Sequence, residues 1–281
     1  MHEAVPSVDD LYRSMGRMIV RFYGRTPGAD CVIASHAILG CSGLDSVFLN
    51  CGVVFGDLPG GEDSAEARLR EFVARIVARG VGGYVCLSEG VQAELEPLAR
   101  HLGLEPLPPI PLMARSSGGD AAQSAPAAHE GLATLLSPDG TSRARSCRVE
   151  PVTTEVGLAE FLAVSEAAFD LPRDLYGRVI TRDLLGDPAL IAYLVRLDGA
   201  AVGCVCVVDD DGVIGVSGMA TLPELQGKGV GGRLLEHVLR AHGDGARVFY
   251  LTASEAGRPL YLRHGFRVVD AATAWVVSPA E

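Results

Sequence analysis

A glycine-rich turn at residues 226–232 carries the clearest chemical signal in the sequence. It reads Gln226, Gly227, Lys228, Gly229, Val230, Gly231 and Gly232. Glycines let a backbone approach a ligand closely, and a helix that begins after such a turn presents unpaired N–H groups to an anion. Lys228, the only lysine in the chain, lies inside the turn. These features predict a site for a phosphate or pyrophosphate group.

Other phosphate-binding patterns fit the turn less well. A Walker A loop requires Ser or Thr after its lysine, and Lys228 is followed by Gly229. Gly227, Gly229 and Gly232 satisfy G-x-G-x-x-G, and Glu255 stands at the spacing of a ribose-binding acid. A dinucleotide fold needs its strand to run directly into the first glycine, but residues 222–226 intervene. Dinucleotide binding and a purely structural turn are the alternatives at this point.

Two motifs in the same half resemble the signatures of the GNAT family of acyl-CoA N-acyltransferases. The segment 219–231 is similar to the Q/R-x-x-G-x-G/A signature, and the segment 259–266 is similar to L-Y-x-x-x-G-F. The two motifs follow each other in the order and spacing of the family. The resemblance extends over about residues 147–281. It implies that acetyl-CoA is the acyl donor.

The resemblance also assigns roles to single residues. Residues matching Met219, Ala220 and Thr221 line the thioester in the family, and Tyr261 stands where an acid would protonate the departing sulfur. The full set expected to contact acetyl-CoA is Met219, Ala220, Thr221, Gln226, Gly227, Lys228, Gly229, Val230, Gly231, Gly232 and Ser254.

The base that would deprotonate the incoming amine is not identified by the resemblance. Many family members carry a glutamate where this chain has Phe249, and often an asparagine where it has Ser254. Both differences leave the detailed mechanism open. Candidates are three carboxylates in the first helical region of this half, which shapes the substrate side in the family, and one histidine of the second motif: Glu166, Asp170, Asp174 and His264.

The periodicity of apolar residues predicts the elements that position these groups. Residues 157–165 and 175–185 read as helices, and three strands at 189–197, 201–208 and 213–221 read as an antiparallel meander. A helix from residue 230, a strand at 248–252 and a short helix at 258–263 follow. Two closing strands are predicted at 266–269 and 274–277. This order is typical of a GNAT domain.

The first half repeats this order without the acyl-CoA motifs. It shows helical stripes at 11–22, 69–77 and 91–102 and strand-like runs at 47–55 and 83–87. Ala99 occupies the place of Tyr261, and the loop 56–63 is acidic. We predict an α/β (α+β) chain of two GNAT-like domains, each a mixed, mostly antiparallel twisted sheet flanked by helices: a degenerate domain at 1–115, a flexible linker at 116–144 and an acetyltransferase domain at 145–281. An unrelated first domain is the alternative.

Composition narrows the functional classes. The net charge of −11 argues against nucleic acid as a partner, because such binding needs basic patches. The sequence shows no secretion signal and no apolar run long enough to span a membrane. Its seven scattered cysteines lack the spacing of a zinc site and suit the reducing cytoplasm. We expect a cytoplasmic protein without a metal.

The sequence thus predicts an acetyl-CoA-dependent N-acetyltransferase. The expected acceptor is an amine of a small molecule, which attacks the thioester directly in a ternary complex. A protein or peptide N-acetyltransferase and a noncatalytic acyl-CoA-binding module are the alternatives. The chain is expected to be a monomer or a homodimer.

Overall fold

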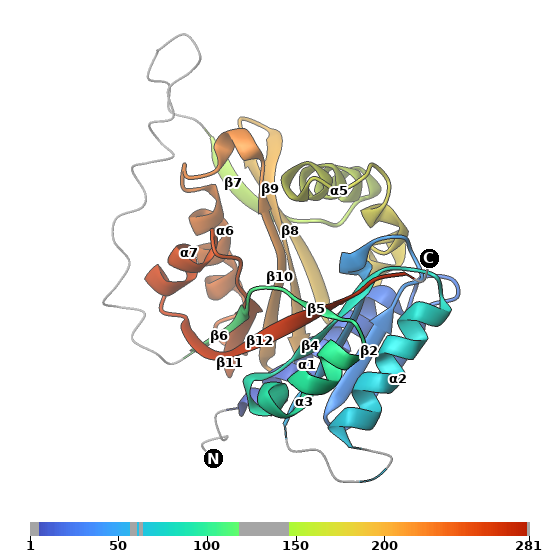
Figure 1. Cartoon of the computed structure of the whole chain (residues 1–281). Helices are drawn as coiled ribbons and strands as arrows, with labels where there is room; N and C mark the ends of the chain where they lie inside the picture. The colour runs from blue at the N-terminus through green and yellow to red at the C-terminus, as the bar shows by residue number, and fades with distance from the viewer. Residues whose placement is uncertain (1–5, 57–60, 62–63, 118–145, 280–281) are drawn as a thin grey trace. The chain divides into compact units, whose positions relative to one another are not determined.

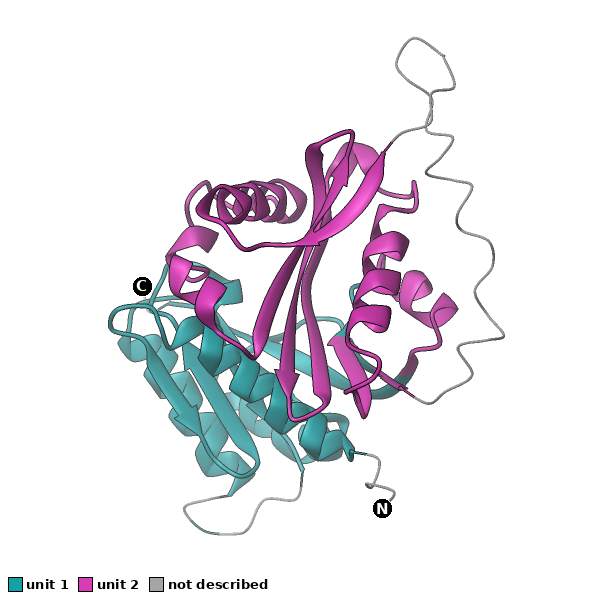
Figure 2. Ribbon diagram, turned by 180° about the vertical axis from the view of Figure 1, so that it is seen from behind, with its two compact units in different colours: residues 1–113, 252–254, 268–281 teal, residues 114–251, 255–267 magenta. Residues whose placement is uncertain are grey.

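The computed structural model in Figure 1 describes residues 6–56, 61, 64–117 and 146–279. The predicted linker at 116–144 lies almost entirely outside these residues. The chain divides into two compact units, which Figure 2 shows in different colours. Unit 1 comprises residues 1–113, 252–254 and 268–281, and unit 2 comprises residues 114–251 and 255–267. Each unit is a mixed, mostly antiparallel sheet with helices.

Unit 2 is built on five strands in the order β11-β10-β9-β8-β7. The strands β7 to β10 pair antiparallel, and β10 and β11 pair parallel around a crossover helix. The elements are β7 (Cys147–Pro151), α5 (Glu155–Phe169), η3 (Tyr176–Arg178), η4 (Arg182–Gly186), β8 (Leu190–Leu197), β9 (Ala200–Asp210), β10 (Val213–Thr221), η5 (Pro223–Leu225), α6 (Val230–Ala241), β11 (Val248–Thr252) and α7 (Arg258–Arg263).

The helices of unit 2 cover both faces of its sheet (Figure 1). Cys204 of β9 lies against α5, where its sulfur is 3.2 Å from the Ser165 hydroxyl. The neighbouring residue Gly203 faces α6, because a Cβ placed on it would lie 2.9 Å from Val230. Successive residues of a strand point to opposite faces, so α5 and α6 pack on opposite sides. Cys204 and Cys206 are both buried.

Most predicted elements of unit 2 are confirmed, with two corrections. The helix predicted at 175–185 is instead two short 3₁₀ pieces, η3 and η4. The intervening Val179, Ile180 and Thr181 are β-branched, and such a run disfavours a continuous α-helix. The two closing strands predicted at 266–269 and 274–277 are one strand, β12 (Arg267–Val277). Its residues from 268 onward belong to unit 1.

Unit 1 has the strand order β1-β2-β3-β4-β12, with β5 also paired to β12. The hairpin strands β1 to β3 are antiparallel, and β3 and β4 are parallel around a crossover helix. The elements are α1 (Val8–Tyr23), β1 (Asp30–Ile33), β2 (Ala37–Cys41), η1 (Val47–Leu49), β3 (Asn50–Val54), α2 (Ala65–Ala78), β4 (Gly83–Leu87), α3 (Glu89–His101) and β5 (Glu105–Pro106). The strand β6 (Ile110–Ser116) spans the sequence boundary between the units. The sequence analysis missed β1, β2, β5, β6 and β7.

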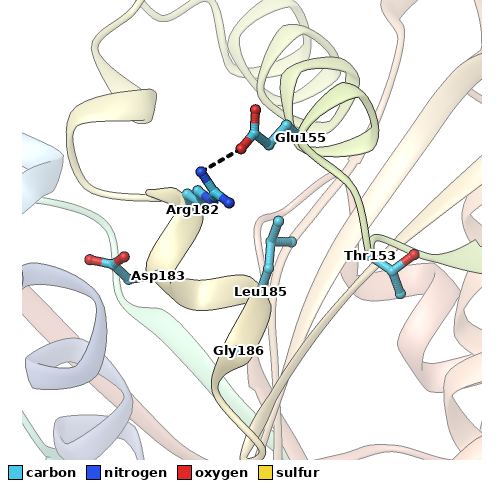
Figure 3. A pocket seen from close by; sticks show the side chains of 6 residues that line it. All are labelled: Thr153, Glu155, Arg182, Asp183, Leu185 and Gly186. Carbon is cyan, nitrogen blue, oxygen red and sulfur yellow. Dashed lines mark ion pairs between the residues drawn. The ribbon is translucent and has the colours of Figure 1, made fainter.

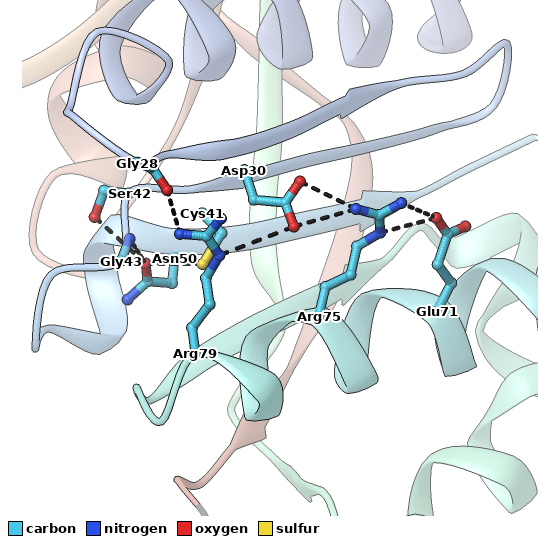
Figure 4. Close-up of polar contacts among 9 residues, drawn as sticks. All are labelled: Gly28, Asp30, Cys41, Ser42, Gly43, Asn50, Glu71, Arg75 and Arg79. Carbon is cyan, nitrogen blue, oxygen red and sulfur yellow. Dashed lines mark hydrogen bonds and ion pairs between the residues drawn. The ribbon is translucent and has the colours of Figure 1, made fainter.

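The core of unit 1 is apolar, and polar contacts fix its loops and one helix face (Figure 4). Arg75 of α2 donates hydrogen bonds to Glu71 at 2.9 Å and to Asp30 of β1 at 3.1 Å. The fully buried Asn50 accepts a bond from the Gly43 amide and donates to three backbone carbonyls of the loops around it. Buried polar groups need such partners, so these contacts serve the fold.

No helix among the described residues is both long and apolar enough to cross a membrane.

Candidate active site

The site is organised by a β-bulge in β10. The pairing of β10 with β9 changes register between Ser217 and Ala220. Gly218 and Met219 therefore stand opposite a single residue of β9, Val205. Gly218 has φ of +61°, a conformation that glycine adopts without the strain of a Cβ. An isolated glycine inside a strand-like run is a sequence signal for such a bulge, although the sequence analysis did not use it.

The strand β10 stops pairing with β11 just before the bulge. The parallel pairing covers residues 213–215 of β10 and 248–250 of β11 and extends no further in the described chain. Residues 217–219 are half-exposed, whereas the first four residues of the strand are buried. Main-chain groups on this edge are thus available to a ligand. Met219, Ala220 and Thr221, predicted to line a thioester, lie on this open part of β10.

The glycine turn follows and ends at the N-terminus of α6. The side-chain amide of Gln226 donates a hydrogen bond to the Thr221 carbonyl at 3.2 Å, which fastens the turn to the end of β10. Gly229 is the N-cap of α6, with φ of +86°. Among the described residues, no backbone or capping hydrogen bond uses the N–H groups of 229–232. With Lys228 exposed beside them, these donors form a cradle for an anion.

The second motif forms α7, which packs on the first turn of α6. A Cβ placed on Gly231 would lie 3.3 Å from Leu260, so the glycine allows the two helices to approach closely. His264 Nε2 of α7 is 3.7 Å from Glu236 of α6. Gly265 ends α7 with φ of +81°, and the chain then folds back. The second motif therefore forms α7, and this helix packs beside the anion cradle.

Tyr261 is buried within this arrangement. Its ring meets Phe266 edge-on, with 6.0 Å between centroids. Burial raises the pKa of the phenol to about 12, so it stays protonated at neutral pH. Its hydroxyl forms no hydrogen bond to another described residue. A neutral, unengaged phenol is suited to donate a proton or a hydrogen bond.

Two predicted positions, Phe249 and Ser254, differ from the rest of the site. Phe249 is buried in β11 in register with Ile214, and the carboxylate common at this place in the family is absent. Ser254 is exposed in the segment 252–254, which belongs to unit 1, whereas the other predicted contacts lie in unit 2. Its role in binding acetyl-CoA stays a prediction.

The three candidate carboxylates are brought together around one pocket. Glu166, Asp170 and Asp174 line a pocket of about 760 Å³ between α5 and η3, together with Arg173 and Arg178. None of these five side chains forms an ion pair with another described residue. Glu166 has one carboxylate oxygen that is buried without a hydrogen-bond partner in the described chain. His264, the C-cap residue of α7, does not line this pocket.

A second pocket lies at the other end of α5 (Figure 3). Glu155 of α5 and Arg182 of η4 face each other across it and form an ion pair of 2.7 Å. The first turn of α5 is already capped, because the Thr154 hydroxyl accepts a hydrogen bond from the Gly157 amide. Two of the three charged side chains that line this pocket, Glu155 and Arg182, neutralise each other, so the pocket offers less to a ligand than the pocket beside η3.

The comparison with protein families decides what this unit is. Residues 188–268 match the family described as "Acetyltransferase (GNAT) domain". They form a GNAT domain. The matched GNAT segment contains the bulge, the glycine turn and Tyr261. No curated protein matches the chain by sequence.

Solved structures extend the fold assignment to the whole chain. A GCN5-related N-acetyltransferase from Kribbella flavida superposes with a TM-score of 0.63 at 18% identity, covering 98% of this chain and 97% of that one. A second from Sphaerobacter thermophilus gives 0.59 at 16%, covering 99% and 96%. A tandem GNAT protein from the clavulanic acid biosynthesis pathway gives 0.55 at 16%, covering 99% and 91%. At these identities the likeness shows the fold alone, a tandem GNAT-like arrangement.

Unit 1 repeats the fold without the features of the site. Its parallel strands stay paired along their length, from Cys51 with Tyr84 to Val54 with Leu87, and leave no opening. The N-terminus of α2 is already capped, because the Ser64 hydroxyl accepts a hydrogen bond from the Ala67 amide. Ala99, at the place of Tyr261, is fully buried. Most of the acidic loop 56–63 lies outside the described residues. These observations support a degenerate first half.

Proposed function

We propose that the GNAT domain is an acetyl-CoA-dependent N-acetyltransferase that acts on an amine of a small molecule. The observation that carries the proposal is the cradle of unused N–H groups at 229–232 beside the open edge of β10. A pyrophosphate would occupy the cradle, next to the helix dipole and Lys228. A pantetheine chain would run along β10, with its amide groups paired to the unpaired main chain.

The chemistry is direct attack of a neutral amine on the thioester carbonyl. A C–N bond forms, the C–S bond breaks, and the sulfur takes up a proton as the amine nitrogen loses one. Main-chain N–H groups of residues 219–221 would stabilise the negative charge on the carbonyl oxygen. Tyr261 would supply the proton or a hydrogen bond to the departing sulfur, because its phenol is neutral at the working pH.

The acceptor would enter from the pocket beside η3. Three carboxylates and two arginines line it, so its formal charge is negative by one, and the carboxylates would bind a cationic amine and take up its proton. Glu166 is the best-placed base, since one of its oxygens has no partner in the described chain. The absence of a carboxylate at Phe249 is consistent with deprotonation from this side. The free cysteines fit a cytoplasmic protein, and the net negative charge fits a protein that binds no nucleic acid. We propose that it acts as a monomer or a homodimer.

Calorimetric titration with acetyl-CoA tests the cofactor site. One site per chain is expected, because unit 1 lacks both the opening and the uncapped helix. Two sites would contradict a degenerate first half, and no binding would contradict the whole proposal. Incubation with acetyl-CoA and a panel of small amines, followed by mass measurement of the products, tests turnover. Binding without any acetylated product would favour a noncatalytic acyl-CoA-binding module.

A further inference from the structure

Tyr176 is a second tyrosine of unit 2 that reaches the bulge of β10, and neither motif contains it. It begins η3, and its hydroxyl lies 3.4 Å from the position that a Cβ on Gly218 would occupy. Gly218 is the first residue of the bulge. The absence of a side chain at this residue leaves room for the hydroxyl.

The neighbours of Tyr176 confirm its place above the bulge. Burial raises the pKa of its phenol, and the nearby thiols of Cys206 and Cys204 raise it further. These cysteines pair with Ser217 and Ala220, the residues on either side of the bulge. The hydroxyl therefore lies next to the bulge, where the register of the β9–β10 pairing shifts.

The Tyr176 hydroxyl is also chemically unengaged. It forms no hydrogen bond to another described residue. A partly buried phenol hydroxyl without a protein partner is available to hydrogen-bond a ligand. Since its pKa is raised, it is a neutral group that both donates and accepts hydrogen bonds.

The same short element faces the acceptor pocket. Gly177 and Arg178 of η3 line that pocket, as does Asp174 before them. One short element thus both lines the acceptor pocket and brings a hydroxyl to Gly218, the residue before Met219.

We propose that the hydroxyl of Tyr176 lies beside the reacting thioester and holds the attacking amine by accepting one of its N–H hydrogens. This inference rests on the proposed function. The phenol forms no covalent bond and keeps its own proton. It orients the nitrogen lone pair toward the carbonyl carbon, a contribution of position and not of acidity.

Nuclear magnetic resonance of protein labelled at tyrosine Cζ tests the location without a known acceptor. Single Tyr→Phe variants assign the signals. On saturation with acetyl-CoA the Tyr176 signal should shift, and it should shift less with CoA, which lacks the acetyl group. The Tyr193 signal is the internal control, because its hydroxyl is bound to His242 on the opposite face of the sheet. An unmoved Tyr176 signal, with binding shown by calorimetry, would overturn the inference alone. No binding at all would overturn it together with the proposed function.

Kinetics then test the role. With an amine that the wild type acetylates, Tyr176→Phe should lower kcat/KM for the amine at least tenfold while the Kd of acetyl-CoA stays within twofold. Tyr193→Phe should leave both unchanged. An unchanged kcat/KM in a folded Tyr176→Phe variant would show that the hydroxyl is only structural. Should the variant not fold, the resonance test on wild-type protein still decides the location.

Discussion

The guanidinium of Arg196 on β8 holds the carboxylate of Glu160 on α5 through two hydrogen bonds, one from each terminal nitrogen. A third bond joins Arg196 to Glu150 of β7. The three residues fasten α5, which forms one wall of the acceptor pocket, to the sheet. The Arg196 side chain is only 13% exposed, and its two partners are about one-third exposed.

Removing this arginine should destabilise unit 2. In Arg196→Met two partly buried carboxylates lose their shared cation, which should cost about 2–3 kcal/mol of unfolding free energy. Arg182→Met is the matched control, because its ion pair with Glu155 is mostly exposed and should contribute less than about 1 kcal/mol. Urea unfolding of both variants measures the difference. Equal losses would show that the Arg196 network does not stabilise the α5 contact.

Replacing Gly229 should weaken acetyl-CoA binding by more than the loss of protein stability alone explains. In Gly229→Ala the left-handed backbone becomes strained by about 1–2 kcal/mol, and a methyl group enters the anion cradle. We expect acetyl-CoA to bind at least about tenfold more weakly, a difference of about 1.4 kcal/mol.

Gly199→Ala is the control for the strain at Gly229. Gly199 has φ of +90° in the turn between β8 and β9, with nothing within 4 Å of an added Cβ. Its substitution should lower the melting temperature by a similar amount and leave the Kd unchanged. If both variants lost affinity equally, the effect would come from folding and not from the cradle.

Tyr261→Phe should slow acetyl transfer and keep acetyl-CoA affinity. Loss of a general acid lowers kcat by about 10²–10⁴-fold in typical enzymes. Because burial raises the pKa of Tyr261 to about 12, its ionisation does not limit the rate below pH 10. The variant should therefore show a lower kcat with the same pH profile over pH 6–10. If the wild type lost activity at alkaline pH and the variant did not, Tyr261 would ionise below pH 10, which would contradict the raised pKa.

His242 should make unit 2 less stable in mild acid. Burial lowers the pKa of this histidine, with a further lowering by His237 that Asp209 opposes. The unfolded chain then takes up a proton first, so the contribution is fully present above the unfolded pKa of about 6.5 and is lost as pH falls through the folded pKa. The Tyr193 hydroxyl lies 3.1 Å from Nε2 of this histidine, so protonation also changes the donor and acceptor roles in that hydrogen bond.

Urea midpoints at pH 7.5 and pH 5 measure this dependence. In His242→Gln the midpoint should fall less between the two pH values than in the wild type. His101→Gln, at an exposed histidine of α3, controls for removal of one imidazole. If the urea midpoint of His242→Gln fell between pH 7.5 and pH 5 by as much as that of the wild type, His242 would not be the source of the pH dependence.

The sequence by itself determined the two motifs of the GNAT domain and the order of its strands and α-helices from β8 to α7. Apolar residues recur in α6 with helical spacing because one face of that helix is buried, and the glycines of 227–231 report a backbone that side chains would block. Both the helical spacing and the glycine pattern are local properties, so they can be recognised from the sequence without knowledge of the fold. The same holds for the first half, where α2, β4 and α3 follow the predicted order.

Only the tertiary structure decided how these parts meet. The bulge at Gly218 depends on its pairing with β9, the opening beside it depends on where β11 stops pairing, and Tyr176 reaches it from another element. The strand β12 joins unit 1 through its pairing with β4, although it follows the GNAT motifs in sequence. Strand pairing joins residues far apart in the chain, and its free energy depends on partners that no local pattern encodes.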